Sequence, residues 1–406
     1  MSPDTDPLLR WRDEFPILAR TTYMVSHSLG AMPRAAAANV AEFAETWATR
    51  GVRAWHEGWW DMPQTVGDLL GRVLGADPGE VLMLPNQSTA QAAVLSCFDW
   101  NGRRNTIVTE RLNFPTNLYL FHAHERIGAR VVTVPSDDGM TIDTARLLDA
   151  IDETTQLVSV SHVLFKSAAI QDLAAIVNRA HNVGALVLAD LYQSAGTVPF
   201  DLHGLGVDFA TGGSVKWLCG GPGAGYLYVR RDRIPTLTPR LTGWAAHRAP
   251  FDFDDGPITY ADGIGRFANG SPAIPALYSA RAGYEIVAQI GVPAIRAKSL
   301  RQTAQLIALA DAAGLPVRSE RAAERRGGTV VLDVPNGEAI THALADRDIL
   351  VDYRPGAGIR IAPHFYSTDE EIERTIAAIV ELRDHQRRSA SSSARIAGAS
   401  TAAPKR

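Results

Sequence analysis

The chain has 406 residues, of which 46% are hydrophobic and 21% charged, and its formal net charge is −4. This length allows about two domains around a large buried core. Because no basic surplus favours nucleic acid or anionic lipid as a partner, we expect a small-molecule substrate. The two cysteines, Cys97 and Cys219, lie far apart without metal-binding spacing, which excludes a disulfide framework and fits a reducing cytoplasm.

The N-terminus carries Asp4 and Asp6 where a signal peptide would have basic residues. No uninterrupted apolar stretch approaches the roughly 18 residues that a membrane span requires. We therefore expect a cytoplasmic protein without a membrane partner. An extended arm, a strand over 22–25 and a helix over about 36–48 are predicted for the first part of the chain.

Residues 64–310 alternate short apolar runs with helical stretches. This alternation predicts βαβ units and a mostly parallel sheet that is covered by helices on both faces. The predicted strands are 106–109, 130–134, 156–160, 185–190, 207–211 and 225–229.

A smaller α+β module follows, with predicted strands at 327–332 and 358–362 and a closing helix over 369–387. The last residues are rich in Ser, Ala and basic groups, a composition that favours disorder. The resulting boundaries are an N-terminal arm with part of the small domain over 1–63, a large domain over 64–310, a small domain over 311–388 and a disordered tail over 389–406.

Lys216 lies between two turns of small residues, Gly212-Gly213-Ser214 and Gly220-Gly221-Pro222-Gly223. Lysine condenses with aldehyde cofactors, and a desolvated pocket keeps enough of its amine neutral for this chemistry. Glycines provide space close to the backbone. The segment indicates an enzyme that uses pyridoxal 5′-phosphate (PLP), although by itself a solvated lysine in a glycine turn would explain it equally well.

Asp190 ends the apolar run 185–190, and it precedes Lys216 by 216 − 190 = 26 residues. Open α/β sheets bind ligands at the carboxyl ends of their strands. A carboxylate there can keep the pyridine nitrogen of PLP protonated, so that the ring withdraws electrons. A lone aspartate at this position is more commonly a helix cap or a turn residue, but together with Lys216 it favours a PLP site.

Seven further motifs follow one another along the chain. They are Ser28-Leu29-Gly30, Asn113-Phe114-Pro115-Thr116, Ser161-His162-Val163, Val207-Asp208-Phe209, Gly243-Trp244-Ala245-Ala246-His247, Gly270-Ser271-Pro272 and Ile359-Arg360-Ile361-Ala362-Pro363-His364-Phe365-Tyr366. In this order and spacing, over about residues 13–385, the chain resembles kynureninase and its relatives among the class-V aminotransferases. The resemblance implies PLP as cofactor, and an α/β fold of type I in which a large domain with a mostly parallel seven-stranded sheet binds PLP beside a smaller α+β domain.

The resemblance also assigns residues to the cofactor. Lys216 and Asp190 are the catalytic pair, and Phe114 stacks on the pyridine ring, whose flat electron-poor face suits an aromatic partner. Ser88 and Thr89 offer donors to the phosphate at a helix N-terminus. A core phenylalanine and an ordinary helix N-cap are the alternative interpretations of these last two features.

Other residues are assigned to the substrate and to a second subunit. By the resemblance, Arg360 grips the substrate α-carboxylate with its planar fork, Ser28 lies near that carboxylate, and His247 contacts the substrate side chain. Trp244 and Ser271 match residues that approach the phosphate and the substrate from the neighbouring subunit, which implies a homodimer with shared sites.

The chain departs from the kynureninase pattern at several positions. Val215 stands where the family has a tyrosine, and Asn117 replaces an aspartate near the cofactor. Gln193 replaces a histidine, as in cysteine desulfurase-like relatives, and its amide can still donate to the 3-hydroxyl oxygen of PLP. His56 matches only approximately a histidine that faces the aromatic ring of the substrate.

The implied function is kynureninase-type hydrolysis, in which the Cβ–Cγ bond of a γ-oxo amino acid is cleaved. The departures leave open a PLP-dependent C–S β-lyase, or a decarboxylating deaminase or aminotransferase-like enzyme of a natural-product pathway. A non-catalytic binding protein with this fold is a further alternative, against which the intact set of Lys216, Asp190 and Arg360 argues. No metal site is expected.

Overall fold

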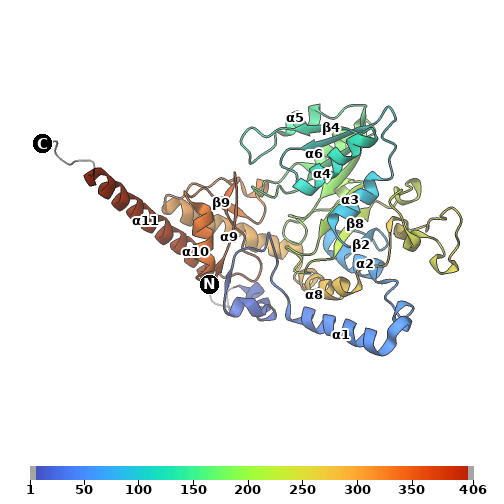
Figure 1. The fold of residues 1–406 in the computed structure, drawn as a ribbon, viewed down its shortest axis with the longest axis horizontal. Helices are drawn as coiled ribbons and strands as arrows, with labels where there is room; N and C mark the ends of the chain where they lie inside the picture. The colour runs from blue at the N-terminus through green and yellow to red at the C-terminus, as the bar shows by residue number, and fades with distance from the viewer. Residues whose placement is uncertain (1–5, 401–406) are drawn as a thin grey trace.

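A computed structural model describes residues 6–400, and the side chains of residues 6–388. A seven-stranded sheet forms the centre of the larger body (Figure 1), in the order β2-β8-β7-β6-β5-β3-β4. The strands are β2 (Val81–Leu84), β3 (Thr106–Glu110), β4 (Arg130–Val134), β5 (Thr155–Ser161), β6 (Leu186–Asp190), β7 (Phe209–Gly213) and β8 (Gly225–Val229). Strand β8 runs antiparallel to both of its neighbours, β2 and β7, and the other pairs of neighbouring strands are parallel, which confirms the predicted mostly parallel sheet.

Both faces of this sheet are buried, as the continuous apolar runs predict. Successive side chains of a strand point to opposite faces. Thus Val158 and Val187 belong to one hydrophobic cluster, whereas their neighbours Leu157 and Leu188 belong to another. The surrounding helices are α2 (Met62–Leu74), α3 (Gln87–Leu95), α4 (Pro115–His124), α5 (Thr144–Asp149), α6 (Leu173–Asn182), α7 (Leu202–Leu205) and α8 (Ile274–Ile290), and α1 (Arg34–Arg50) packs along α8.

The small module contains a three-stranded antiparallel sheet in the order β11-β12-β9. Its strands are β9 (Val330–Leu332), β11 (Asp352–Arg354) and β12 (Gly358–Ile361), and its helices are α9 (Val292–Ala312), α10 (Gly337–Ala345) and α11 (Asp369–Ser400). The N-terminal arm joins this module, because β1 (Thr22–Tyr23) pairs in parallel with β10 (Ile349–Leu350). Arg12 of the arm also forms an ion pair of 2.7 Å with Glu371.

Short 3₁₀ helices connect these elements. They are Pro7–Glu14, Pro16–Ala19, Gly51–Trp55, Glu125–Ile127, Ile234–Thr236, Trp244–Ala246, Pro250–Asp252, Ile264–Phe267 and Ala323–Arg325. No helix in the described part of the chain is both long enough and apolar enough to cross a membrane.

The structure differs from the sequence prediction in four places. The strand predicted at 207–211 lies two residues later, in β7, and β2 was not predicted. Leu306 and Ala310 of α9, which the prediction placed in the large domain, lie in the hydrophobic cluster of the small module.

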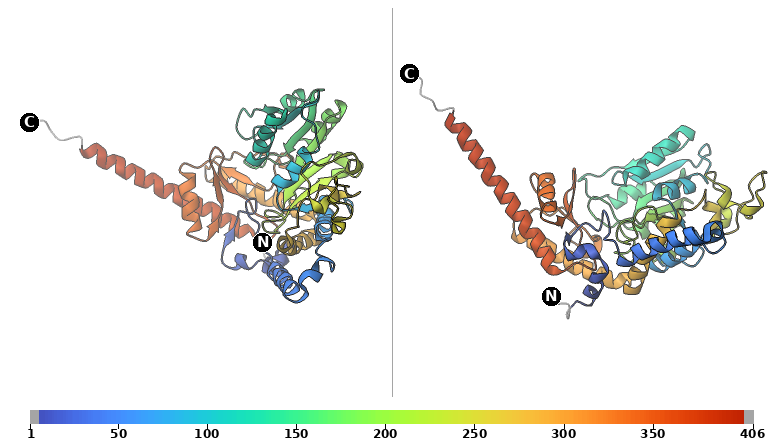
Figure 2. Two further views of the ribbon diagram at one scale, coloured as in Figure 1. Left: turned by 45° about the vertical axis from the view of Figure 1, so that its right-hand side comes forward. Right: turned by 60° about the horizontal axis from the view of Figure 1, so that its bottom comes forward.

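The fourth difference lies in the predicted disordered tail over 389–406, of which the structure describes residues 389–400. Helix α11 continues to Ser400 and projects away from the body in all views (Figure 2), and residues 401–406 lie outside the described residues. The alanines and Arg395 of this segment have high helix propensity, so a helix that has already formed extends through it.

Candidate active site

A cavity of about 120 Å³ opens at the carboxyl ends of β5 and β6. These strands pair in parallel with Ser161 opposite Asp190, so both end at the same edge of the sheet. The cavity is lined by Gln87, Phe114, Ser161, Val163, Phe165, Asp190, Tyr192, Gln193 and Lys216. The structure therefore brings Lys216 and Asp190 to one small chamber.

The Asp190 carboxylate is buried and held by hydrogen bonds rather than by a cation. Its Oδ1 accepts from the Tyr192 backbone N–H (2.8 Å), and its Oδ2 accepts from Asn117 Nδ2 (2.9 Å). Asn117 Nδ2 also donates to Asn113 Oδ1 (2.6 Å). An aspartate at position 117 would place two carboxylates in contact, so the amide of Asn117 is the group that tolerates an ionised Asp190.

Lys216 points between aromatic rings. Its Nζ lies 4.3 Å from the centre of the Tyr192 ring and 5.6 Å from that of Phe114. Burial lowers the pKa of Lys216 to about 8; the Asp190 carboxylate raises this pKa and the Arg360 guanidinium lowers it. The lowered pKa leaves more of the amine neutral near pH 7 than an exposed lysine would have, which suits a nucleophile.

Phe114 is the N-cap residue of α4. Pro115 fixes the first turn of this helix, and Asn113 Oδ1 accepts from the Phe114 N–H (2.8 Å). The Phe114 ring makes an edge contact with Phe165, at 5.2 Å between ring centres, and is 40% exposed. One face of the ring is therefore available to a flat ligand in the cavity.

The backbone around Lys216 is wedged between two glycines. The Gly30 N–H donates to Val215 O (2.8 Å), and a Cβ built on Gly30 would lie 2.1 Å from Lys216 O. A Cβ on Gly283 of α8 would lie equally close, 2.1 Å, to Leu218 O. Only residues without a side chain permit this approach.

Gln193 joins the Lys216 loop to the N-terminal turn. Its Oε1 accepts from Trp217 Nε1 (2.9 Å), and its Nε2 donates to His27 O (3.1 Å). One N–H of its amide remains for a ligand. Ser28, the next residue in that turn, is half-buried, and the turn places it beside the loop that carries Lys216.

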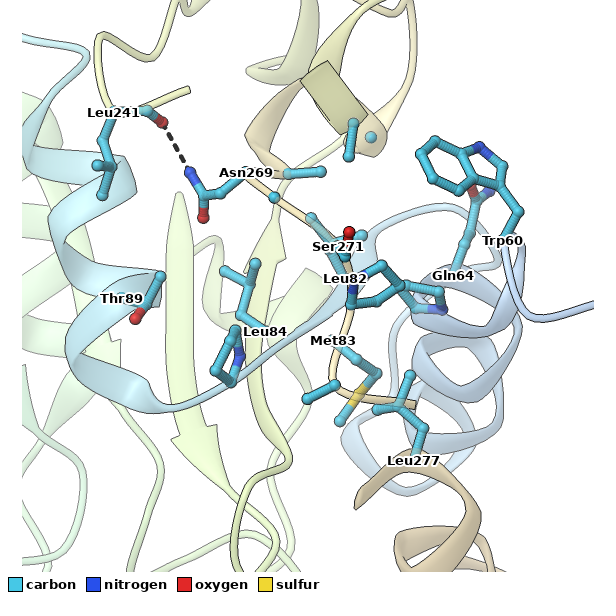
Figure 3. Close-up of a pocket in the computed structure, with 18 of the residues that line it drawn as sticks. Trp60, Gln64, Leu82, Met83, Leu84, Thr89, Leu241, Asn269, Ser271 and Leu277 are labelled. Atoms are coloured by element: carbon cyan, nitrogen blue, oxygen red, sulfur yellow. Dashed lines mark hydrogen bonds between the residues drawn. The ribbon is translucent and has the colours of Figure 1, made fainter. Parts of the chain in front are cut away.

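A second cavity, of about 670 Å³, is lined by Ser88, Thr89 and Ser271 among others (Figure 3). Thr89, at the N-terminus of α3, and Ser271, on the loop before α8, lie on two sides of it (Figure 3). Asn86 caps α3 by accepting from the Thr89 N–H (2.9 Å). Because Gln87, the first residue of α3, lines the smaller cavity, this helix N-terminus borders both cavities.

The remaining predicted residues lie farther from Lys216. His247 lines the larger cavity. His56 is exposed and packs on Phe251, at 5.2 Å between ring centres, without lining either cavity. The ring centres of Trp244 and Trp60 are 4.9 Å apart, and both rings belong to the same aromatic cluster as Phe251. Within this one chain, the structure does not bring His56 or Trp244 to Lys216.

Arg360 is 2% exposed and already paired. Its Nε and Nη2 donate to Asp352 Oδ1 and Oδ2 at 2.6 and 2.7 Å, and its Nη1 donates to Phe165 O. His27 Nε2 lies 3.3 Å and Arg354 Nη2 3.0 Å from the same carboxylate. Three of the five guanidinium N–H donors are used, which leaves one on each terminal nitrogen for a substrate.

Sequence reasoning missed Tyr192, Phe165 and Asp352. Tyr192 follows Asp190 by two residues, but nothing in the sequence indicates that its ring lies under Lys216. Asp352 could have been found: it stands opposite Arg360 in the β11–β12 register, and oppositely charged residues that flank a short glycine turn are typical of a cross-strand pair.

The chain is similar to known proteins over most of its length. The aminotransferase class-V family matches residues 23–374. The kynureninase of Burkholderia pseudomallei (strain 1106a) is 34% identical over 364 residues, which are 86% of each chain, and that of Pseudomonas fluorescens is 32% identical over 399 residues, 94% of each chain.

Solved structures share the fold. A cysteine desulfurase from Thermococcus onnurineus has a TM-score of 0.83 at 21% identity and covers 93% of this chain and 98% of its own. A variant of the lyase C-DES, with glycine covalently linked to its PLP cofactor, has a TM-score of 0.82 at 23% identity and covers 91% and 98%.

Replacing Gly30 tests the close packing behind Lys216. Because its new Cβ would overlap Lys216 O, we expect Gly30→Ala to destabilise the protein by about 1–3 kcal/mol and to weaken PLP binding. Gly263, whose Cβ would meet nothing within 4 Å, provides the control variant Gly263→Ala. Urea unfolding and PLP titration measure both effects, and equal results for the two variants would contradict the account.

Replacing Asp352 tests the buried pair that positions Arg360. Asp352→Asn breaks this pair, so we expect a loss of about 3–5 kcal/mol of unfolding free energy at pH 7, whereas Asp333→Asn, at an exposed aspartate, changes it little. Burial raises the pKa of Asp352, but His27 and Arg360 hold it well below its usual range.

A depressed pKa stabilises the fold above the unfolded-state pKa and loses that effect as the pH falls. The difference between wild type and Asp352→Asn should therefore shrink below about pH 4. Urea unfolding from pH 7 to pH 3 measures it, and a difference that stays constant over this range would show that the ion pair is not its source.

Proposed function

The chain belongs to the kynureninases within the aminotransferase class-V family, and from this premise we propose that it hydrolyses the Cβ–Cγ bond of a γ-oxo amino acid such as L-kynurenine. The protein is a PLP-dependent enzyme. The observation that carries the proposed site is that Lys216 and a buried Asp190 without an ion pair line the same small cavity.

The cavity fits PLP in three respects. Asp190 is a buried carboxylate whose two hydrogen-bond donors are both neutral, so a protonated pyridine nitrogen would provide its missing cation. The neighbouring Asn117 Oδ1 is buried without a hydrogen-bond partner among the described residues. The N-terminus of α3, with Ser88 and Thr89, offers a site for a phosphate.

When bound, PLP withdraws electrons from the bonds at the α-carbon of an amino acid. In the proposed reaction Lys216 would hold the cofactor, and its free amine would move the proton of the substrate α-carbon. Asp190 would keep a proton on the pyridine nitrogen, Phe114 would cover the ring, and Gln193 would donate to its 3-oxygen.

Arg360 is proposed to hold the substrate carboxylate through the N–H groups that Asp352 and Phe165 leave free. Ser28 lies in the adjacent turn and is proposed to assist. With the carboxylate fixed, the side chain of the substrate extends toward the larger cavity, where His247 is proposed to contact it. Hydrolysis adds one water across the Cβ–Cγ bond and releases alanine and an aromatic acid.

A C–S β-lyase is the second candidate. Gln193 replaces the histidine of the kynureninase pattern and is bonded to Trp217 Nε1 and His27 O. It favours this candidate because cysteine desulfurase-like relatives carry glutamine there. Identifying the products distinguishes the two reactions, since the β-lyase would give pyruvate, ammonia and a thiol.

We further propose a homodimer in a reducing, cytoplasmic compartment, with Trp244 and Ser271 serving the site of the partner subunit. Trp244 and Phe253 are 39% and 73% exposed and lie with Phe251 in one aromatic cluster. Apolar groups gathered in this way are typical of an interface. Cys97 and Cys219 are both free thiols, which supports the compartment.

Turnover tests the reaction. Purified enzyme is mixed with L-kynurenine, 3-hydroxykynurenine or an S-alkyl cysteine, and the products are identified by mass spectrometry. We expect alanine and an aromatic acid from the kynurenines, and no turnover by Lys216→Ala, which lacks the amine. If Lys216→Ala kept most of the wild-type turnover, the assignment of Lys216 would be wrong. Pyruvate formed from the cysteine substrate, with no product from the kynurenines, would favour the β-lyase.

Mixed dimers test the sharing of sites. Lys216→Ala and Ser271→Trp are each expected to be inactive as homodimers, because one lacks the amine and the other fills the proposed phosphate approach. A heterodimer retains one site with both native groups, so we expect up to about half the wild-type activity per dimer. Verified heterodimers without activity would count against sharing.

A further inference from the structure

Two arginines, Arg296 and Arg326, are buried together at the junction of the small module and the large domain. They are 9% and 2% exposed. Arg296 lies on α9, and Arg326 lies in a segment that bridges to Ala169, on the turn after β5. In the part of the chain that the structure describes, no carboxylate forms an ion pair with either guanidinium, which is unusual for buried charges.

The two guanidinium groups bind backbone carbonyls instead. Arg326 Nη1 donates to Glu320 O (2.8 Å) and Arg321 O (2.7 Å). Arg296 Nη2 donates to Ala323 O (2.9 Å) and to the carbonyl of Arg326 itself (2.7 Å). The positive groups are therefore held close together between α9 and the 320–326 loop.

Several buried polar atoms at this junction have no hydrogen-bond partner among the described residues. They include Arg296 Nη1, Arg326 Nε and Ser299 Oγ. Ser299 is 3% exposed and follows Arg296 by three residues, so both lie on one face of α9. Buried hydrogen-bond donors normally have an acceptor, so each of these atoms requires a partner.

The electrostatics favour a negative partner. Burial, and then the charge of Arg326, lower the pKa of Arg296 to about 10, which leaves both arginines charged. Burial and the charge of Arg296 lower the pKa of the neighbouring His162 to about 4, so this ring is neutral at pH 7 and its Nδ1 is a further atom without a partner. Burial lowers the pKa of Arg326, and the charge of Glu324 raises it. Glu324 is exposed and forms no ion pair with either guanidinium among the described residues, so the buried pair keeps a net positive charge.

We propose that Arg296, Ser299 and Arg326 bind a monovalent anion of halide size, such as chloride, between α9 and the 320–326 loop. The three side chains are each less than a tenth exposed, and three donors suit a small spherical anion better than an oxyanion with four acceptor atoms. The anion would join the loop to α9, next to the turn that carries Phe165 into the Lys216 cavity.

Thermal unfolding of the PLP-loaded enzyme tests the site with bromide as the probe. Sodium bromide replaces sodium gluconate at constant ionic strength, because gluconate is too large for an enclosed site. We expect a saturable rise in Tm of about 2–4 °C. An equal Tm in both salts, or a rise with sulfate and none with bromide, would overturn the proposal.

Variants assign the response to these residues. Ser299→Ala removes one donor and should raise the bromide midpoint about tenfold, and Arg296→Met should abolish the response. Arg325→Met, at an exposed arginine in the same loop, is the control and should respond like wild type. A wild-type response in Arg296→Met would contradict the assignment.

Anomalous diffraction from bromide-soaked crystals of the wild-type enzyme does not depend on how the variants fold. The expected result is an anomalous peak within hydrogen-bond distance of Arg296 Nη1 and Arg326 Nε. Electron density there without an anomalous signal, at a bromide concentration that saturates the thermal response, would identify ordered water and refute the anion site.

Discussion

The site depends on how the buried Asp190 carboxylate is held by two neutral hydrogen-bond donors. Burying an ionised carboxylate costs several kcal/mol, and each hydrogen bond from Asn117 and the Tyr192 N–H returns about 1.5–3 kcal/mol. These two bonds offset the cost without removing the negative charge. The carboxylate is therefore held in place and still gains from a positive partner, which is the condition for binding a protonated pyridine nitrogen.

In the described structure, the positively charged groups of the site form no ion pair with Asp190. Arg360 would be a strong partner for Asp190, but Asp352 holds it from the adjacent strand of the small module, and Phe165 O holds its third N–H. Lys216 lies between two rings and forms no ion pair among the described residues, and burial lowers its pKa. Each charged group thus keeps one side for a ligand, and the large and small modules each contribute one carboxylate.

Much of this arrangement follows from local sequence, and the rest depends on contacts that the sequence does not reveal. The strands that end at Ser161 and Asp190 are apolar runs, and the parallel sheet that they predict brings their ends together. The role of Gln193 as a bridge between Trp217 and His27 arises only when the N-terminal turn packs on the Lys216 loop. Tertiary contacts likewise determine that residues 81–84 form the edge strand β2 and that α9 packs in the small module. Tertiary contacts also bring the His56 ring against the Phe251 ring.

The central claim is that one lysine, set in this cavity, holds the cofactor. The most direct measurement is to load the protein with PLP, reduce it with sodium borohydride, which fixes PLP to the lysine that holds it, and map the modified peptide by mass spectrometry. We expect the label on Lys216, which among the described residues is the lysine that lines the same cavity as Asp190. A label on Lys166 or Lys298, or one spread over several lysines, would contradict it.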